Sequence, residues 1–148
     1  MKDFLVKFLS TSFFVGYFPK APGTVSSFLI LAVVWFLFPE NQIHLVTLAV
    51  ILLAINILVT KRAEEIFGED SRKIVLDESL GMVVSLLWIQ KSLLFYFLAF
   101  ILFRATDVIK PFPIRELEKI KGGWGVMLDD FLAGVYTNLI LQLLILIF

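Results

Sequence analysis

This chain consists of apolar runs separated by polar segments that hold nearly all of its charged residues. The runs occupy residues 25–38, 43–59, 79–89, 93–103 and 126–148. Only the last of them contains charged side chains, the pair Asp129 and Asp130. Hydrophobic residues make up 59% of the 148 residues, against about 45–50% in soluble domains. Because a soluble domain of this length cannot bury so much apolar surface, the sequence predicts a membrane protein.

The distribution of charge indicates how the runs cross the bilayer. If the first four runs form two hairpins, the polar segments 1–23, 60–78 and 104–125 all lie on one side. That side then holds every Lys and Arg except Lys91, and among the acids only Glu40 lies opposite. If residues 79–103 instead formed one span, basic residues would lie on both faces, against their tendency to stay in the cytoplasm. We therefore expect the polar segments to face the cytoplasm.

These patterns predict an all-α, polytopic membrane helical bundle with about five transmembrane or half-spanning helices. Residues 1–18 interleave Phe with polar residues, which predicts an N-terminal helix lying in the interface. Pro19, Pro22 and Gly23 are expected to end it. Residues 60–76 are expected to continue a helix into water, as far as Gly68. The whole chain, 1–148, is predicted to be a single integral membrane domain.

The composition excludes several classes of function. The 13 basic residues balance the 13 acidic ones, which gives no indication of nucleic-acid binding. The chain has no Cys and only one His, so thiolate catalysis and chemistry that needs two imidazoles are excluded. No Asp-x-Asp sequence is present either, which removes the usual signature of aspartyl-phosphate hydrolases. A metal-dependent phosphoryl reaction that uses carboxylates remains.

Five carboxylates lie beside apolar runs: Asp77, Glu78, Asp107, Asp129 and Asp130. Ionisable groups at membrane depth are costly and usually functional. Acids that converge near one interface repel one another and need cations, and their hard oxygen ligands suit Mg²⁺ or Mn²⁺. Alternatively, the two acid pairs cap the apolar helices that they open, where the helix dipole favours negative charge. The two interpretations are compatible, and the number of acids favours the metal.

Three polar segments have two interpretations each. Arg104, Asp107 and Lys110 share one helix face, which suits a phosphate beside a metal or an exposed ion-paired surface. Residues 121–125 have three Gly, which suit an anion-binding loop or a turn anchored by its Trp. The hydroxyls of residues 24–27 are expected to cap a helix, or to donate to phosphate with help from Lys20.

Four polar side chains lie within or beside the apolar runs without a catalytic assignment. His44 falls on the side opposite the charged segments and is expected to be a bystander. Asn56, Ser85 and Asn138 lie inside apolar runs and are expected to form hydrogen bonds between helices.

Four sequence blocks together resemble one protein family, the bacterial phosphatidylglycerophosphatase A lipid phosphatases. They are residues 16–24 (Gly-Tyr-Phe-Pro-Lys-Ala-Pro-Gly-Thr), 77–81 (Asp-Glu-Ser-Leu-Gly), 104–114 (Arg-Ala-Thr-Asp-Val-Ile-Lys-Pro-Phe-Pro-Ile) and 121–130 (Lys-Gly-Gly-Trp-Gly-Val-Met-Leu-Asp-Asp). They follow the order of the family and span most of the chain. The chain departs from the family at Ser26, where Gly is usual, and at Ala105 and Thr106, where aromatic residues are usual.

The resemblance implies an enzyme of the bacterial inner membrane with Mg²⁺ as cofactor. It would remove the terminal phosphate of phosphatidylglycerophosphate to give phosphatidylglycerol. Its partners would be the phospholipid substrate and the membrane, with no nucleic acid. The alternative from the residues alone is a small carrier or channel that binds a cation through buried carboxylates, and a third possibility is an assembly factor.

In the expected mechanism, Mg²⁺ neutralises phosphate charge and polarises a water, while a remaining carboxylate acts as general base. A carboxylate nucleophile is the alternative. The metal ligands are expected among all five acids named above. The catalytic carboxylates are expected among Asp129, Asp130, Glu78 and Asp107. The groups expected to bind the phosphate are Thr24, Lys20, Arg104, Lys110 and Lys121.

Overall fold

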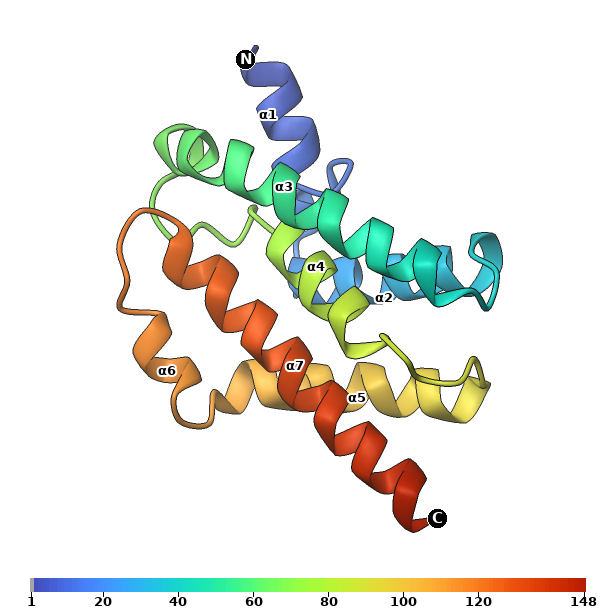
Figure 1. Cartoon of the computed structure of the whole chain (residues 1–148). Coiled ribbons are helices and arrows are strands. Elements are labelled where there is room, and N and C mark those ends of the chain that lie inside the picture. Colours follow the sequence, from blue (N-terminus) through green and yellow to red (C-terminus); the bar gives the residue numbers. More distant parts are fainter. Residues whose placement is uncertain (1) are drawn as a thin grey trace.

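The computed structural model describes residues 2–148, which fold entirely as helices and loops without a strand in that range (Figure 1). The α-helices are α1 (Asp3–Ser10), α2 (Pro22–Leu37), α3 (Gln42–Phe67), α4 (Leu76–Ser85), α5 (Leu93–Ile109), α6 (Ile114–Leu117) and α7 (Trp124–Ile147). A short 3-10 helix, η1 (Val15–Tyr17), precedes α2. The predicted all-α class is confirmed.

Local sequence signals fix the ends of α2 and α3. The Asn41 side chain accepts a hydrogen bond from the backbone N–H of Ile43 at 2.9 Å, which caps the start of α3. The helix continues through the polar residues and ends before Gly68, at a φ of 96°, as the sequence predicted. Pro22 does not interrupt a helix but opens α2, because the first helical turn needs no backbone donor.

The ten-residue helix α4 lies at the centre of the fold. It contacts α2, α3, α5 and α7, and every one of its residues except Glu78 is buried. Figure 1 shows it between the diverging α3 and α7. Gly81 and Gly134 permit this packing: a Cβ at Gly134 would meet the Gly81 carbonyl, and a Cβ at Gly81 would lie 2.6 Å from the Phe103 ring. Small residues thus bring α4 and α7 into backbone contact.

Two amide side chains, one buried and one partly buried, connect α4 to its neighbours. The Asn138 amide donates to the carbonyls of Ser85 at 3.2 Å and Leu87 at 2.6 Å, at the C-terminal end of α4. The Asn56 amide donates to the Leu76 carbonyl at 3.4 Å, at the other end. The predicted interhelical bonds are therefore confirmed for both Asn residues. The prediction is wrong for the Ser85 hydroxyl, which bonds back within its own helix, as hydroxyls in helices commonly do.

The N-terminal segment is less helical than its pattern of Phe residues predicts. The expected helix over residues 1–18 ends at Ser10 in the structure, and Met1 lies outside the described residues. Ser12, Phe13 and Phe14 have positive φ angles of 47°, 60° and 69°, so the chain turns instead. Whether this segment lies in the membrane interface stays a prediction.

Two helices are long and apolar enough to cross a membrane. They are α3, with a mean hydropathy of 2.5, and α7, with 1.8, while α2 is a shorter apolar helix. Residues 86–92 separate α4 from α5, so residues 79–103 are not one continuous helix. The loops after α2 and α4 lie at the same end of the fold, opposite the loops that precede α4 and α7 (Figure 1). This arrangement agrees with the hairpin interpretation, although the number of spans stays a prediction.

We predict that Gly134→Ala lowers the free energy of unfolding by about 1–3 kcal/mol, because the added methyl group forces α7 away from α4. Ala favours a helix over Gly, so a loss of stability would report the helix contact itself. Unfolding in detergent, followed by circular dichroism, measures the change. Ala54→Val, at an exposed position of α3, is the control and should change little. Equal stabilities for the two variants would contradict the prediction.

Candidate metal and phosphate site

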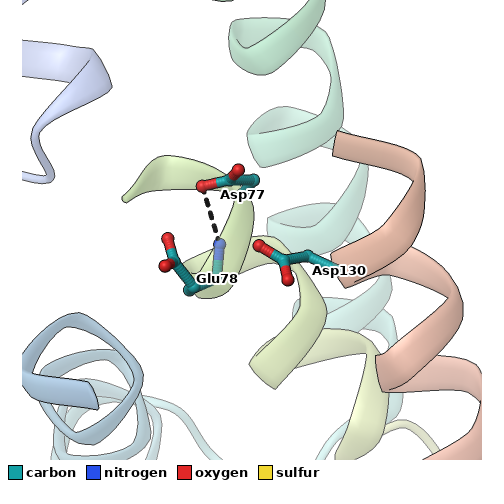
Figure 2. Close-up of side chains that lie close together, drawn as sticks. All are labelled: Asp77, Glu78 and Asp130. Atoms are coloured by element: carbon teal, nitrogen blue, oxygen red, sulfur yellow. Dashed lines mark hydrogen bonds between the residues drawn. The ribbon is translucent and has the colours of Figure 1, made fainter. Parts of the chain in front are cut away.

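Three carboxylates from two helices meet beside the start of α4. Asp77 and Glu78 lie in the first turn of α4, and Asp130 lies in the second turn of α7. One oxygen from each lies within 4.8 Å of the other two, and Figure 2 shows the three side chains converging. Asp77 and Asp130 are only 2% and 4% exposed. Because oxygen ligands at this spacing can surround one small ion, the group is a candidate metal site.

The three carboxylates form part of a cavity of about 230 Å³. The cavity is lined by Asp70, Ser71, Arg72, Ile74, Asp77, Glu78, Asp107, Lys110, Val126, Asp129 and Asp130. All five acids that the sequence singled out therefore reach one space, although they come from three separate helices. The tertiary structure thus brings together what the chain separates by more than 50 residues.

Two of the five acids are held by basic side chains. Arg104 lies 2.7 Å from Asp107 on the same helix face, as the spacing predicted. Lys110 ends α5 with a positive φ of 49° and reaches away from that face, to Asp129 at 2.9 Å and Glu118 at 2.7 Å. The predicted ion pair is therefore confirmed for Arg104 and Asp107, although both side chains are partly buried and not exposed, while Lys110 links α5 to α7 and to the segment before it.

Charge and burial together leave the site short of positive charge. Burial, then the charge of Glu78, raises the pKa of Asp77 well above its usual range. Burial, then the charge of Asp130, raises the pKa of Glu78 to about 8. Glu78 Oε2 and Asp129 Oδ1 are buried and have no hydrogen-bond partner among the described residues. Unpartnered buried carboxylate oxygens are costly, so the residues present fit a hard divalent cation such as Mg²⁺.

Lys110 contributes a permanent positive charge at the rim of this space. Burial lowers its pKa, but the hydrogen bonds and charges of Glu118 and Asp129 outweigh burial, and the net direction is upward. The ammonium group therefore stays protonated at neutral pH. It offsets part of the negative charge of the cavity without occupying the place where the three carboxylates converge.

The capping interpretation of the acid pairs is wrong for one of them. Asp129 and Asp130 do not open α7, because the helix already begins at Trp124. Asp77 and Glu78 do lie in the first turn of α4, where the helix dipole favours negative charge. Helix capping thus cannot account for both pairs.

The hydroxyls near the start of α2 do not cap it either. Its N-cap is Ala21, without a side-chain hydrogen bond. The buried Ser26 hydroxyl contacts the Val75 carbonyl at 3.0 Å and the Ser79 hydroxyl at 2.8 Å, while Ser27 bonds back within its own helix. The family departure at Ser26 thus adds a contact between α2 and the start of α4.

Of the five residues expected to bind phosphate, only Lys110 lines the carboxylate cavity; Thr24, Lys20, Arg104 and Lys121 do not. Lys121 instead lines a separate cavity of about 240 Å³, together with Lys119 and the acids Glu64, Glu69, Asp70 and Glu118. Gly122 and Gly123 have φ angles of 83° and 79°, so the glycines serve the turn that starts α7. The interpretation of residues 121–125 as a turn is therefore the one that the structure favours.

The sequence pattern missed three lining residues, Asp70, Ser71 and Arg72. They belong to the loop between α3 and α4, which was expected only to connect helices. The loop has no periodicity, so nothing in the sequence could show which of its side chains turn inward. The only indication that the sequence offered was that these residues lie close to Asp77 along the chain.

Comparison with known proteins shows the family of the chain. The sequence pattern of the family described as Phosphatidylglycerophosphatase A matches residues 8–145. The chain belongs to this family. The predicted resemblance is thus confirmed, and membership supports a phosphatase enzyme of phospholipid metabolism with a phospholipid substrate. The two apolar helices and the bacterial relatives together support a membrane protein.

Three relatives match most of the chain. A Bacteroides thetaiotaomicron protein named "Putative phosphatidylinositol-3-phosphatase" is 36% identical over 94% of this chain and 92% of its own length. Proteins named Phosphatidylglycerophosphatase A from Haemophilus influenzae and Escherichia coli are 34% and 33% identical, over 91% and 87% of this chain and 85% and 77% of their own lengths. No solved structure matches the chain.

The metal site predicts a specific effect of Mg²⁺ on stability. At a Mg²⁺ concentration of about 100 times the dissociation constant, the folded protein should gain about 2.7 kcal/mol. Asp130→Asn should raise the Tm without Mg²⁺, because a repelling charge is removed, and should largely abolish the rise in Tm with Mg²⁺. Thermal unfolding of the purified chain, with Mg²⁺ or with chelator, measures both effects.

The control for this experiment is Glu116→Gln, which changes an exposed acid paired with Lys119 outside the cavity. This variant should keep the full response to Mg²⁺. A response that survives in Asp130→Asn as fully as in Glu116→Gln would show that the ion binds elsewhere.

Proposed function

We propose that this protein is a Mg²⁺-dependent phosphatase that hydrolyses the terminal phosphate monoester of phosphatidylglycerophosphate to give phosphatidylglycerol. The observation that supports this most directly is the convergence of buried acids from α4, α5 and α7 on one cavity, in a chain of the phosphatidylglycerophosphatase A family. We further propose that the chain is a single integral domain of the bacterial inner membrane, with the cavity facing the cytoplasm. The concentration of basic residues on that side supports this orientation.

In this proposal Asp77, Glu78 and Asp130 hold the Mg²⁺, because their oxygens converge. The bound ion would supply positive charge to neutralise the phosphate oxygens as the phosphoryl group transfers. Asp107 and Asp129, each engaged by a basic residue, complete the ring of acids. They are less suited to direct ligation because one oxygen of each already faces a cation.

Asp129 is the best placed general base. Lys110 binds its Oδ2 at 2.9 Å, and its Oδ1 is buried without a partner. One oxygen thus fixes the carboxylate while the other is available to accept a proton from an attacking water. Because Lys110 and Arg104 offset charge next to the cavity, they would stabilise the transferring phosphoryl group as well as orient the acids.

Of the five residues predicted to bind phosphate, the proposal gives a role to two. Lys110 lines the cavity, and Arg104 pairs with a residue that does. Thr24 is half-buried and follows Gly23, where an added Cβ would meet Glu78, so it remains next to the site without lining it. Lys20 and Lys121 are exposed and have no part in this mechanism.

The lipid would keep its acyl chains in the bilayer while its phosphate reaches the cavity. Large apolar side chains are exposed on the helices around α4, including Phe36, Leu58, Phe97 and Leu146. Such a surface is suited to lipid rather than to water. The name of the Bacteroides relative adds a phosphoinositide as a second substrate to compare.

The test is phosphate release by the purified full chain from phosphatidylglycerophosphate and from phosphatidylinositol 3-phosphate in mixed micelles. We expect release from the first lipid with Mg²⁺ and none with chelator. Asp130→Asn should lower kcat by about 10²-fold or more, since loss of metal charge removes several kcal/mol of transition-state stabilisation. Asp3→Asn, which alters only an exposed ion pair with Arg62, is the control.

Full activity of Asp130→Asn would refute the role of that residue. Absence of Mg²⁺-dependent release from every lipid by the wild-type chain would refute the proposed function and leave the cation carrier or the assembly factor. Preferential release from phosphatidylinositol 3-phosphate would contradict the proposed substrate while keeping the reaction.

A further inference from the structure

The carboxylate cavity has one basic side chain that is not already engaged. Six acids and two cations line the cavity, and one of the cations, Lys110, binds Glu118 and Asp129. The other cation is Arg72, in the loop between α3 and α4. Within residues 2–148 the Arg72 side chain makes no ion pair with any of these acids, although the cavity is rich in them.

To attract a phosphate, the cavity needs positive charge that its carboxylates have not already neutralised. A phosphate monoester carries close to two negative charges at neutral pH. The charge of one divalent cation is already outweighed by three carboxylates at close range. A guanidinium group is always charged and presents its donors in a planar fork that matches two phosphate oxygens.

We propose that Arg72 binds the phosphate monoester dianion of the substrate at the mouth of this cavity. The inference rests on the proposed function, which it deepens, because the reaction places that group beside the carboxylates. Arg72 is thus a substrate-binding residue that sets affinity for the phosphate. It takes the role that the sequence suggested for Lys20 and Lys121, neither of which lines the cavity.

The loop that presents Arg72 is anchored on both sides of it. The backbone N–H of Ile74 donates to the Ser71 carbonyl at 3.0 Å, which closes a turn around Arg72. The N–H of Val75 donates to the Ser10 carbonyl at 2.9 Å, which ties the end of the loop to the N-terminal segment. Because the turn is held in place, the backbone that carries Arg72 needs little further ordering, and the bound anion would order only its exposed side chain.

The adjacent Lys73 provides a matched control. Its ammonium lies 5.2 Å from the centroid of the Tyr17 ring and 5.5 Å from that of Phe67, and it does not line the cavity. Two neighbouring cations of the same loop therefore face different surroundings. A general electrostatic effect would respond to the loss of either, and a direct contact only to the loss of Arg72.

The experiment compares Arg72→Ala, Arg72→Lys and Lys73→Ala in the full chain with Mg²⁺. We expect Arg72→Ala to raise KM for the phosphatidylglycerophosphate micelle by about tenfold or more, with a smaller change in kcat, since it removes a charge-assisted contact. Competitive inhibition by inorganic phosphate should weaken by a similar factor. The KM of Arg72→Lys should lie between those of Arg72→Ala and the wild type, and the KM of Lys73→Ala should match that of the wild type.

The KM for the lipid and the inhibition by inorganic phosphate together show whether Arg72 contacts the phosphate monoester or another part of the headgroup. A rise in KM together with weaker phosphate inhibition supports a contact to the phosphate monoester itself. A rise in KM with unchanged phosphate inhibition would overturn that assignment and place the contact elsewhere on the headgroup. Equal effects of Arg72→Ala and Lys73→Ala, or no effect of either, would also overturn it.

Failure of this inference can be told apart from failure of the proposed function. If the wild-type chain releases phosphate with Mg²⁺ and Arg72→Ala behaves identically, only the role of Arg72 is lost. If the wild-type chain releases none, the proposed function fails. In that case, the rise in Tm on adding inorganic phosphate with Mg²⁺ can still be compared between Arg72→Ala and Lys73→Ala, because it needs no turnover. If Arg72→Ala keeps the full rise, the contact is overturned.

Discussion

The mutual repulsion of carboxylates in a low-dielectric interior governs this structure. Asp77 and Asp130 are almost fully buried, and their oxygens converge with that of Glu78. Such a group is stable only if protons or cations supply the missing positive charge. Protons hold it in the absence of metal, as the raised pKa of Glu78 indicates. In the function proposed above, a divalent cation would replace those protons and would attract the phosphate.

The short helix α4 makes that burial possible. A ten-residue helix is too short to be stable alone, so its position depends on α2, α3, α5 and α7 around it. Gly81 and Gly134 bring α7 close enough for Asp130 to stand beside Asp77. The Asn56 and Asn138 amides hold the two ends of α4, which fixes the level at which its acids lie.

The basic side chains next to the cavity are of two kinds: two are paired with acids, and one has no such partner among the described residues. Arg104 and Lys110 are bound to acids and orient them, so part of their charge is already used within the fold. Arg72 comes from a loop and has no such partner among the described residues. A phosphatase needs both kinds, because the acids must be held and the incoming anion must still find an attractive surface.

The sequence by itself determined the helical class, the end of α3 at Gly68, and the five acids that line one cavity, because apolar periodicity, caps and charges beside apolar runs are local signals. It did not determine that α7 starts before Asp129, that the first helix stops at Ser10, or that Ser26 bonds to α4 instead of capping α2. Only the tertiary structure decided that Arg72 lines the cavity and Lys121 does not. The physical reason is that loop side chains follow no period, so their direction is set by the backbone contacts of the folded chain.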